Sequence, residues 1–233
     1  MKTYRYILFD ADDTLLDFQR SEREAFAAAL LESQLGLDFE QSYEQYTIIN
    51  RALWLDYEQN KVTQTQLRSE RFYRLFQQLK MDHDAKVFGD LYLRHFAAGS
   101  FLTPDALAVC DQLKSKFQLS IITNGIRDVQ FSRILGSALH NHFDHIIVSD
   151  DVGFAKPAPQ IFDYAMEKIG CTDKSEVLIV GDSLSSDIRG GHQYGIDTCW
   201  YNPNEFTNTS DIKPTYEISK LTQLVKLLSE RTR

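Results

Sequence analysis

Two clusters of carboxylates follow short apolar segments of this sequence. Asp10-Ala11-Asp12-Asp13-Thr14 comes directly after residues 6–9, and Asp182, with Asp187 five residues later, follows residues 177–180. Unpaired anions at the end of a buried strand are costly, and Mg²⁺ prefers oxygen ligands of this kind. We therefore predict that Asp10 and Asp182 share a magnesium ion and that Asp187 orients Asp182. The alternatives are an acidic turn and a helix N-cap.

Two further polar turns lie after other apolar segments. Thr123-Asn124-Gly125 offers a hydroxyl, an amide and backbone N–H groups, which suit the oxygens of a phosphate. Lys156 stands between alanine and proline ahead of a predicted helix, and the prolines stiffen its approach. Taken singly, Asn-Gly is a common turn and a lone lysine is usually solvated.

The elements that position these turns alternate along the chain. Apolar segments typical of buried parallel strands occupy residues 6–9, 119–123, 145–149, 177–180 and 198–201, and helical apolar spacing lies between them. This order predicts a doubly wound α/β sheet, in which all four turns meet at the carboxyl edge of the strands. A nucleophilic carboxylate, a second carboxylate that moves a proton, a metal ion, phosphate-binding donors and a lysine together serve phosphoryl transfer.

The segment between the first predicted strand and the next has another character. Residues 17–98 show amphipathic helical spacing and no convincing strand. We predict a helical cap domain at 17–98, inserted into an α/β core domain formed by 1–16 and 99–233. An insertion at this point leaves the carboxyl edge of the sheet, so it is placed to act as a lid.

Composition excludes several classes of protein. The 233 residues are 43% apolar with a formal net charge of -8, which is typical of a globular protein and unsuited to polymeric nucleic acid. The three cysteines have no paired spacing, so neither a zinc site nor a disulfide framework is predicted. The first apolar stretch is too short for a signal peptide or a membrane span, which predicts a cytoplasmic protein without a membrane partner.

In order along the chain, the four turns resemble the signatures of the haloacid dehalogenase superfamily. The resemblance implies a Rossmann-like core, Asp10 as nucleophile and Asp12 as general acid and then base. It implies magnesium bound by Asp10, Asp182 and the carbonyl of Asp12; Mn²⁺ could take its place. The phosphoryl group would be bound by Thr123, Asn124 and Lys156. Dehalogenases of the family lack the second aspartate, so Asp12 favours phosphate esters.

Three segments resemble the branch of house-cleaning pyrimidine 5′-nucleotidases: residues 9–15, 50–57 and 197–202. That branch hydrolyses pyrimidine nucleoside monophosphates such as dUMP, dTMP, UMP and modified analogues. Asn50, Trp54 and Tyr57 have the spacing of one helical face, which could offer an amide and aromatic surface to a base. Packing inside the cap is the alternative for each.

Other functions remain open at this point. The nearest is a sugar-phosphate phosphatase or a phosphosugar mutase with the same lid. A signalling module phosphorylated on Asp10 is disfavoured, because a stable acyl-phosphate has no use for a base beside it. A scaffold without activity is disfavoured because each expected reactive side chain is present. The sequence does not set the preferred nucleotide or the oligomeric state.

Overall fold

A computed structural model describes residues 3–59 and 61–229 of the chain. It contains two compact units: Met1–Phe18 with Ser100–Arg233, and Gln19–Gly99. The first is an α/β unit and the second is helical. No helix among the described residues combines the length and the apolar character needed to cross a membrane.

The α/β unit is built on a six-stranded sheet of order β3-β2-β1-β4-β5-β6, in which all the pairs are parallel. The predicted fold class is confirmed. β1 and β4 are buried along their whole length, as expected of strands covered by helices on both faces. The strands are β1 (Tyr6–Phe9), β2 (Gln118–Thr123), β3 (His145–Val148), β4 (Val177–Gly181), β5 (Asp197–Tyr201) and β6 (Tyr216–Ile218).

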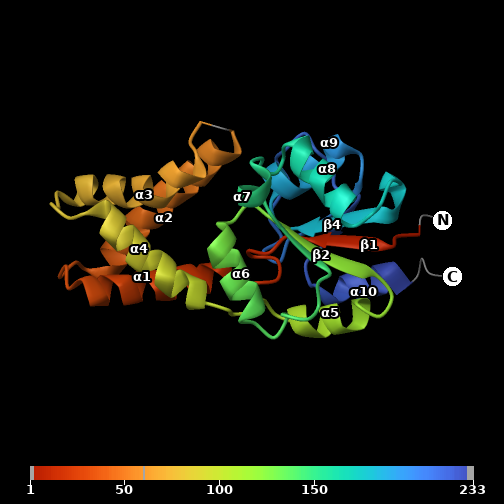
Figure 1. The fold of residues 1–233 in the computed structure, drawn as a ribbon, viewed down its shortest axis with the longest axis horizontal. Coiled ribbons are helices and arrows are strands. Elements are labelled where there is room, and N and C mark those ends of the chain that lie inside the picture. The colour runs from red at the N-terminus through yellow and green to blue at the C-terminus, as the bar shows by residue number, and fades with distance from the viewer. Residues whose placement is uncertain (1–2, 60, 230–233) are drawn as a thin grey trace. The chain divides into compact units, whose positions relative to one another are not determined.

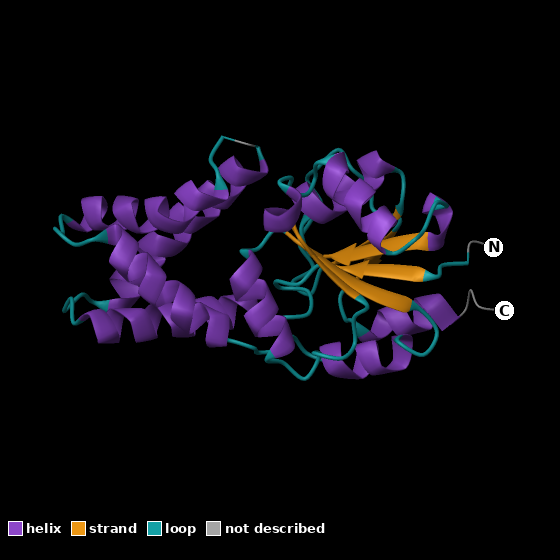
Figure 2. Ribbon diagram, in the orientation of Figure 1, coloured by secondary structure: helices purple, strands orange, loops and turns teal. Residues whose placement is uncertain are grey.

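Helices cover both faces of this sheet (Figures 1 and 2). Among the described residues of the α/β unit, the helices are α5 (Ala106–Leu113), α6 (Arg127–Leu135), α7 (Ser149–Val152), α8 (Pro159–Lys168), α9 (Arg189–Tyr194) and α10 (Thr222–Ser229). Two short turns, η1 (Lys174–Glu176) and η2 (Leu184–Ile188), adjoin β4, and η2 is π-helical. One predicted strand was one residue too long, because Ser149 begins α7.

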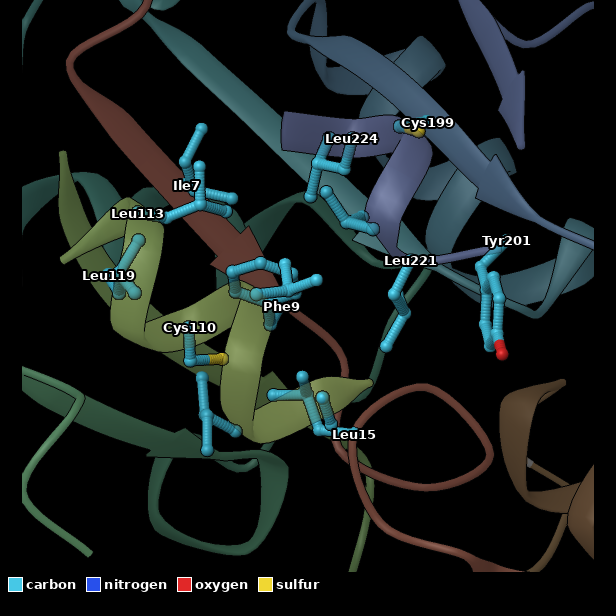
Figure 3. Packing of buried hydrophobic residues seen from close by; sticks show 14 of the residues in the cluster. Ile7, Phe9, Leu15, Cys110, Leu113, Leu119, Cys199, Tyr201, Leu221 and Leu224 are labelled. Carbon is cyan, nitrogen blue, oxygen red and sulfur yellow. The ribbon is translucent and has the colours of Figure 1, made fainter. Parts of the chain in front are cut away.

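Successive side chains of β1 point to opposite faces of the sheet. Ile7 and Phe9 pack with residues of α5 and α10 in one apolar cluster, part of which Figure 3 shows. Tyr6 and Leu8 pack with residues of α8 in a second cluster. Because both faces of β1 are covered, its carboxyl end is fixed in position.

The helical unit contains α1 (Phe18–Ser33), α2 (Phe39–Glu58), α3 (Gln64–Leu79) and α4 (Ala85–Ala98). Side chains that accept backbone N–H groups start three of these helices. Asp38 caps α2, Thr63 forms a capping box with Gln66 at α3, and Asp84 caps α4. Stacked and tilted rings of Tyr46, Phe72 and their neighbours fill the interior.

A polar network lies among these rings. The Asn50 amide donates to Glu22 Oε1 (2.7 Å), and its oxygen accepts from Arg71 Nη1 (3.3 Å). The Tyr43 hydroxyl also donates to Glu22 (3.3 Å). Glu22, Asn50 and Arg71 are at most 5% exposed. Asn50 is therefore part of the interior of the helical unit.

We expect Glu22→Gln to change how the stability of the chain depends on pH. Burial raises the pKa of Glu22 to about 7, against a lowering by Arg71. Between pH 4.5 and about 7 the folded chain therefore keeps a proton that the unfolded chain releases, so this carboxyl's contribution to stability falls as the pH rises. A glutamine side chain does not ionise, so the variant avoids this fall in stability as the pH rises. Thermal unfolding should give the variant a Tm a few degrees above wild type at pH 8 and close to it at pH 4.5.

The matched control for this experiment is Glu24→Gln, because Glu24 is an exposed carboxylate on the same helix. It should leave the pH dependence of the Tm unchanged. A difference between Glu22→Gln and wild type that is equal at both pH values would contradict the expectation.

Candidate active site

The carboxyl ends of two adjacent strands, β1 and β4, bring the predicted carboxylates together. β1 lies between β2 and β4, Asp10 follows β1, and Asp182 follows β4. Ligand oxygens of Asp10, Asp182 and Asp187 all lie within 4.8 Å of one another. Asp187 reaches this cluster from η2, the turn that follows Asp182.

Lys156 neutralises part of this charge. It follows α7 and is 1% exposed. Its Nζ donates to Asp10 Oδ1 (2.5 Å), Asp187 Oδ1 (2.7 Å) and the carbonyl oxygen of Ile122 (2.7 Å). Burial alone would lower the pKa of Lys156, but Asp10 and Asp187 outweigh it and raise the pKa. The lysine is therefore a fixed cation.

One lysine does not balance three carboxylates. Burial raises the pKa of Asp10 to about 8, even though Lys156 opposes the change. Burial, followed by the charge of Asp10, raises the pKa of Asp182 well above its ordinary value. A divalent cation with oxygen ligands would relieve this excess of negative charge. The cluster therefore fits Mg²⁺.

Asp187 differs from the other two carboxylates because both of its oxygens are engaged. Oδ1 accepts from Lys156, and Oδ2 accepts from the backbone N–H of Ser183 (3.0 Å). Gly181 leaves it room, since a Cβ there would lie 2.3 Å from the Asp187 carboxyl carbon. This placement suits a residue that orients its neighbours.

Thr123 and Asn124 lie at the end of β2, and the Asn124 side-chain amide is hydrogen-bonded to the backbone of Lys156. Its Nδ2 donates to the Lys156 carbonyl (2.9 Å), and its Oδ1 accepts from the Lys156 backbone N–H (2.7 Å). Asn124 therefore holds the loop that carries Lys156. The Thr123 hydroxyl is buried and accepts from the Gly125 N–H (3.2 Å).

Asp12 meets two residues that the sequence analysis missed. Gln130 Nε2 donates to Asp12 Oδ2 (2.5 Å), and Arg133 Nη1 forms an ion pair with Asp12 Oδ1. Both partners lie on α6, three residues apart, and are buried. The signal in the sequence is two polar residues on the helix face that also carries Val129 and Ile134.

The three predicted cap residues lie in the helical unit, on α2. Asn50 is buried in the polar network described above. Trp54 and Tyr57 are half-buried and meet edge to face, with ring centroids 5.8 Å apart. The Trp54 indole N–H is buried and meets no acceptor among residues 3–59 and 61–229.

The doubly wound sheet and its carboxylate cluster define a hydrolase of the haloacid dehalogenase type. Residues 4–195 match the family model of the haloacid dehalogenase-like hydrolases, and the chain belongs to this family. The family predicted from the four turns is confirmed.

Members of this family align with nearly the whole of this chain. The chain is 38% identical to the HAD-hydrolase YfnB of Bacillus subtilis (strain 168), over 98% of this chain and 97% of YfnB. The structure of YfnB bound to magnesium superimposes with a TM-score of 0.91 and covers 97% of this chain and 99% of that one.

Two further relatives carry a named activity. Pyrimidine 5′-nucleotidase YjjG of Escherichia coli (strain K12) is 32% identical, over 96% of this chain and 97% of its own length. Pyrimidine 5′-nucleotidase PynA of Streptococcus pneumoniae (strain ATCC BAA-255 / R6) is 33% identical, over 97% and 96%. These relationships confirm the predicted enzyme class and agree with a phosphomonoesterase.

Proposed function

We propose that this chain is a magnesium-dependent 5′-nucleotidase that hydrolyses pyrimidine nucleoside monophosphates through an aspartyl-phosphate on Asp10. The observation that carries the proposal is the cluster of Asp10, Asp182, Asp187 and Lys156 at the carboxyl edge of the sheet, in which all but the half-buried Asp182 are buried. The named activity of YjjG and PynA, which are similar over nearly their whole length, supports the choice of substrate.

The first half-reaction is transfer of the phosphoryl group to the protein. A carboxylate oxygen of Asp10 attacks phosphorus, and the bond from phosphorus to the 5′-oxygen of the nucleoside breaks. Asp12 gives its proton to that oxygen, so the nucleoside leaves as an alcohol. In the second half-reaction Asp12 takes a proton from water, the water oxygen attacks the phosphorus of the aspartyl-phosphate, and Asp10 and inorganic phosphate are released.

Charge neutralisation accompanies both steps. Lys156 holds Asp10 in place and presents its positive charge to the phosphoryl oxygens, with the Thr123 hydroxyl and the backbone N–H groups after β2 as further donors. Magnesium, held by Asp10, Asp182 and the carbonyl of Asp12, would supply the remaining positive charge for a dianionic phosphate.

The helical unit is proposed to be the cap that selects the substrate. Trp54 and Tyr57 are half-buried and offer aromatic surface to a base. Asn50 supports α2 from inside through Glu22 and Arg71. A sugar-phosphate substrate would need mainly hydroxyl-binding groups, which an aromatic pair does not provide.

The test is phosphate release from a panel of dUMP, dTMP, UMP, AMP, glucose 6-phosphate and 4-nitrophenyl phosphate. Each substrate is assayed with Mg²⁺, with Mn²⁺ and with excess chelator. We expect the pyrimidine nucleotides to show the highest kcat/KM and the chelator to stop turnover. Glucose 6-phosphate turned over as well as dUMP would refute the choice of substrate, and activity in chelator would refute the role of the metal.

A further inference from the structure

The Asp12 side chain is held by two residues that do not belong to the cluster of Asp10, Asp182 and Asp187. Its carboxylate lies between Gln130 and Arg133, each of which donates to a different oxygen. Arg133 is fully buried, whereas the Asp12 side chain is 26% exposed. A carboxylate that accepts a hydrogen bond at each oxygen is fixed in one orientation. Both donors lie on α6, a helix that packs against the apolar core through Ile134.

Gln130 also connects Asp12 with the end of β2. The same Nε2 group that donates to Asp12 donates to the Thr123 hydroxyl (3.1 Å), while Gln130 Oε1 accepts from Arg133 (3.4 Å). The amide is thereby oriented by three groups at once. It sets the position of Asp12 relative to a proposed phosphate-binding residue.

Gly125 provides the space for this amide. A Cβ at position 125 would lie 2.2 Å from Gln130 Nε2 and 2.5 Å from its Cγ. Such a distance forces the Gln130 side chain to move, and because that side chain is buried, its hydrogen bonds to Asp12 and Thr123 would break. The glycine of the Asn124-Gly125 turn thus serves the position of Asp12.

We propose that Gln130 and Arg133 are positioning residues that aim the Asp12 carboxyl at the leaving-group oxygen, and that Gly125 makes room for Gln130. The inference rests on the proposed role of Asp12 as proton donor. A proton donor that is displaced by about 1 Å still belongs to a folded protein but transfers its proton poorly. The deficit should therefore depend on how much the leaving group needs a proton.

The experiment compares kcat/KM for two substrates that share the phosphoryl group. This parameter covers the steps up to departure of the leaving group, whose oxygen needs a proton in dUMP far more than in 4-nitrophenyl phosphate. We expect Gln130→Met, Arg133→Met and Gly125→Ala each to lower kcat/KM for dUMP by about 10- to 100-fold, part of the 10²–10⁴ that a general acid supplies. The loss for 4-nitrophenyl phosphate should be severalfold at most.

A merely structural role would give another pattern. Ile134→Val is the control, because Ile134 is a buried residue of the same helix in the apolar cluster, and it should affect both substrates equally. In an Asp12→Asn background, Arg133→Met should lower the kcat/KM for dUMP less than twofold further, because the group on which it acts is gone.

The outcomes separate the two proposals. Equal losses on both substrates, or losses that multiply with that of Asp12→Asn, would overturn the positioning role while the phosphatase stands. Failure of the wild-type protein to release phosphate from either substrate would refute the proposed function, and the positioning role with it.

Discussion

Replacing Asp10 with asparagine should abolish turnover and leave the protein folded. The amide cannot form the acyl-phosphate, and loss of a nucleophile removes at least about 10⁴-fold in kcat. The amide oxygen can still accept from Lys156 Nζ, which lies 2.5 Å from Asp10 Oδ1. Since burial disfavours the charged form of Asp10, a neutral side chain should be tolerated at least as well.

Two measurements check this expectation. The first is phosphate release from dUMP and 4-nitrophenyl phosphate. The second is the Tm without metal, which should equal or exceed that of wild type, whereas the gain in Tm on adding Mg²⁺ should shrink because one ligand is lost. Turnover within tenfold of wild type would exclude Asp10 as the nucleophile, and a lower metal-free Tm would contradict the electrostatic account of the cluster.

The second large effect is expected from Lys156→Met. The change keeps a long side chain but leaves Asp10 and Asp187 buried without their shared cation. Removing one partner of a buried ion pair costs about 3–5 kcal/mol of folding free energy. Loss of a charge aimed at the reacting phosphate should also lower kcat by at least about 10²-fold. Chemical denaturation without metal and steady-state kinetics with Mg²⁺ measure the two losses separately.

A double variant distinguishes the two consequences. Adding Asp187→Asn to Lys156→Met removes one of the stranded charges, so part of the lost stability should return while turnover stays low. If the single variant proved as stable as wild type without metal, the expected cost in folding free energy of leaving Asp10 and Asp187 without their cation would be wrong.

The sheet and the cluster were accessible from the sequence for a physical reason. Strands buried on both faces must be apolar throughout, so residues 6–9 and 177–180 stand out, and polar residues directly after them fall at one edge. Asp10, Asp182 and Lys156 converge because segments that follow parallel strands all begin at the same edge of the sheet. Their chemical roles remain proposals.

The contacts that surround the cluster could not be predicted in this way. The Asn124 amide bonds to the backbone of Lys156, thirty-two residues later, through a loop conformation that no spacing encodes. Helical period places Gln130 and Arg133 on a buried face, but it does not say that Asp12 is their partner. Asn50 likewise has the spacing of a ligand-contacting face, yet its own side chain donates to Glu22 in the interior of the helical unit.

The place of the helical unit in the chain also sets the order in which a ribosome can complete the fold. Tyr6 of β1 pairs with Gln118 of β2 and with Val177 of β4, so the central strand is made well before either of its neighbours. In the inserted unit, which is synthesised in between, α3 contacts its neighbours in sequence, α2 and α4. During translation, β1 therefore emerges as an apolar strand with both edges open, and it stays exposed to aggregation or to chaperones until β2 and β4 have been made.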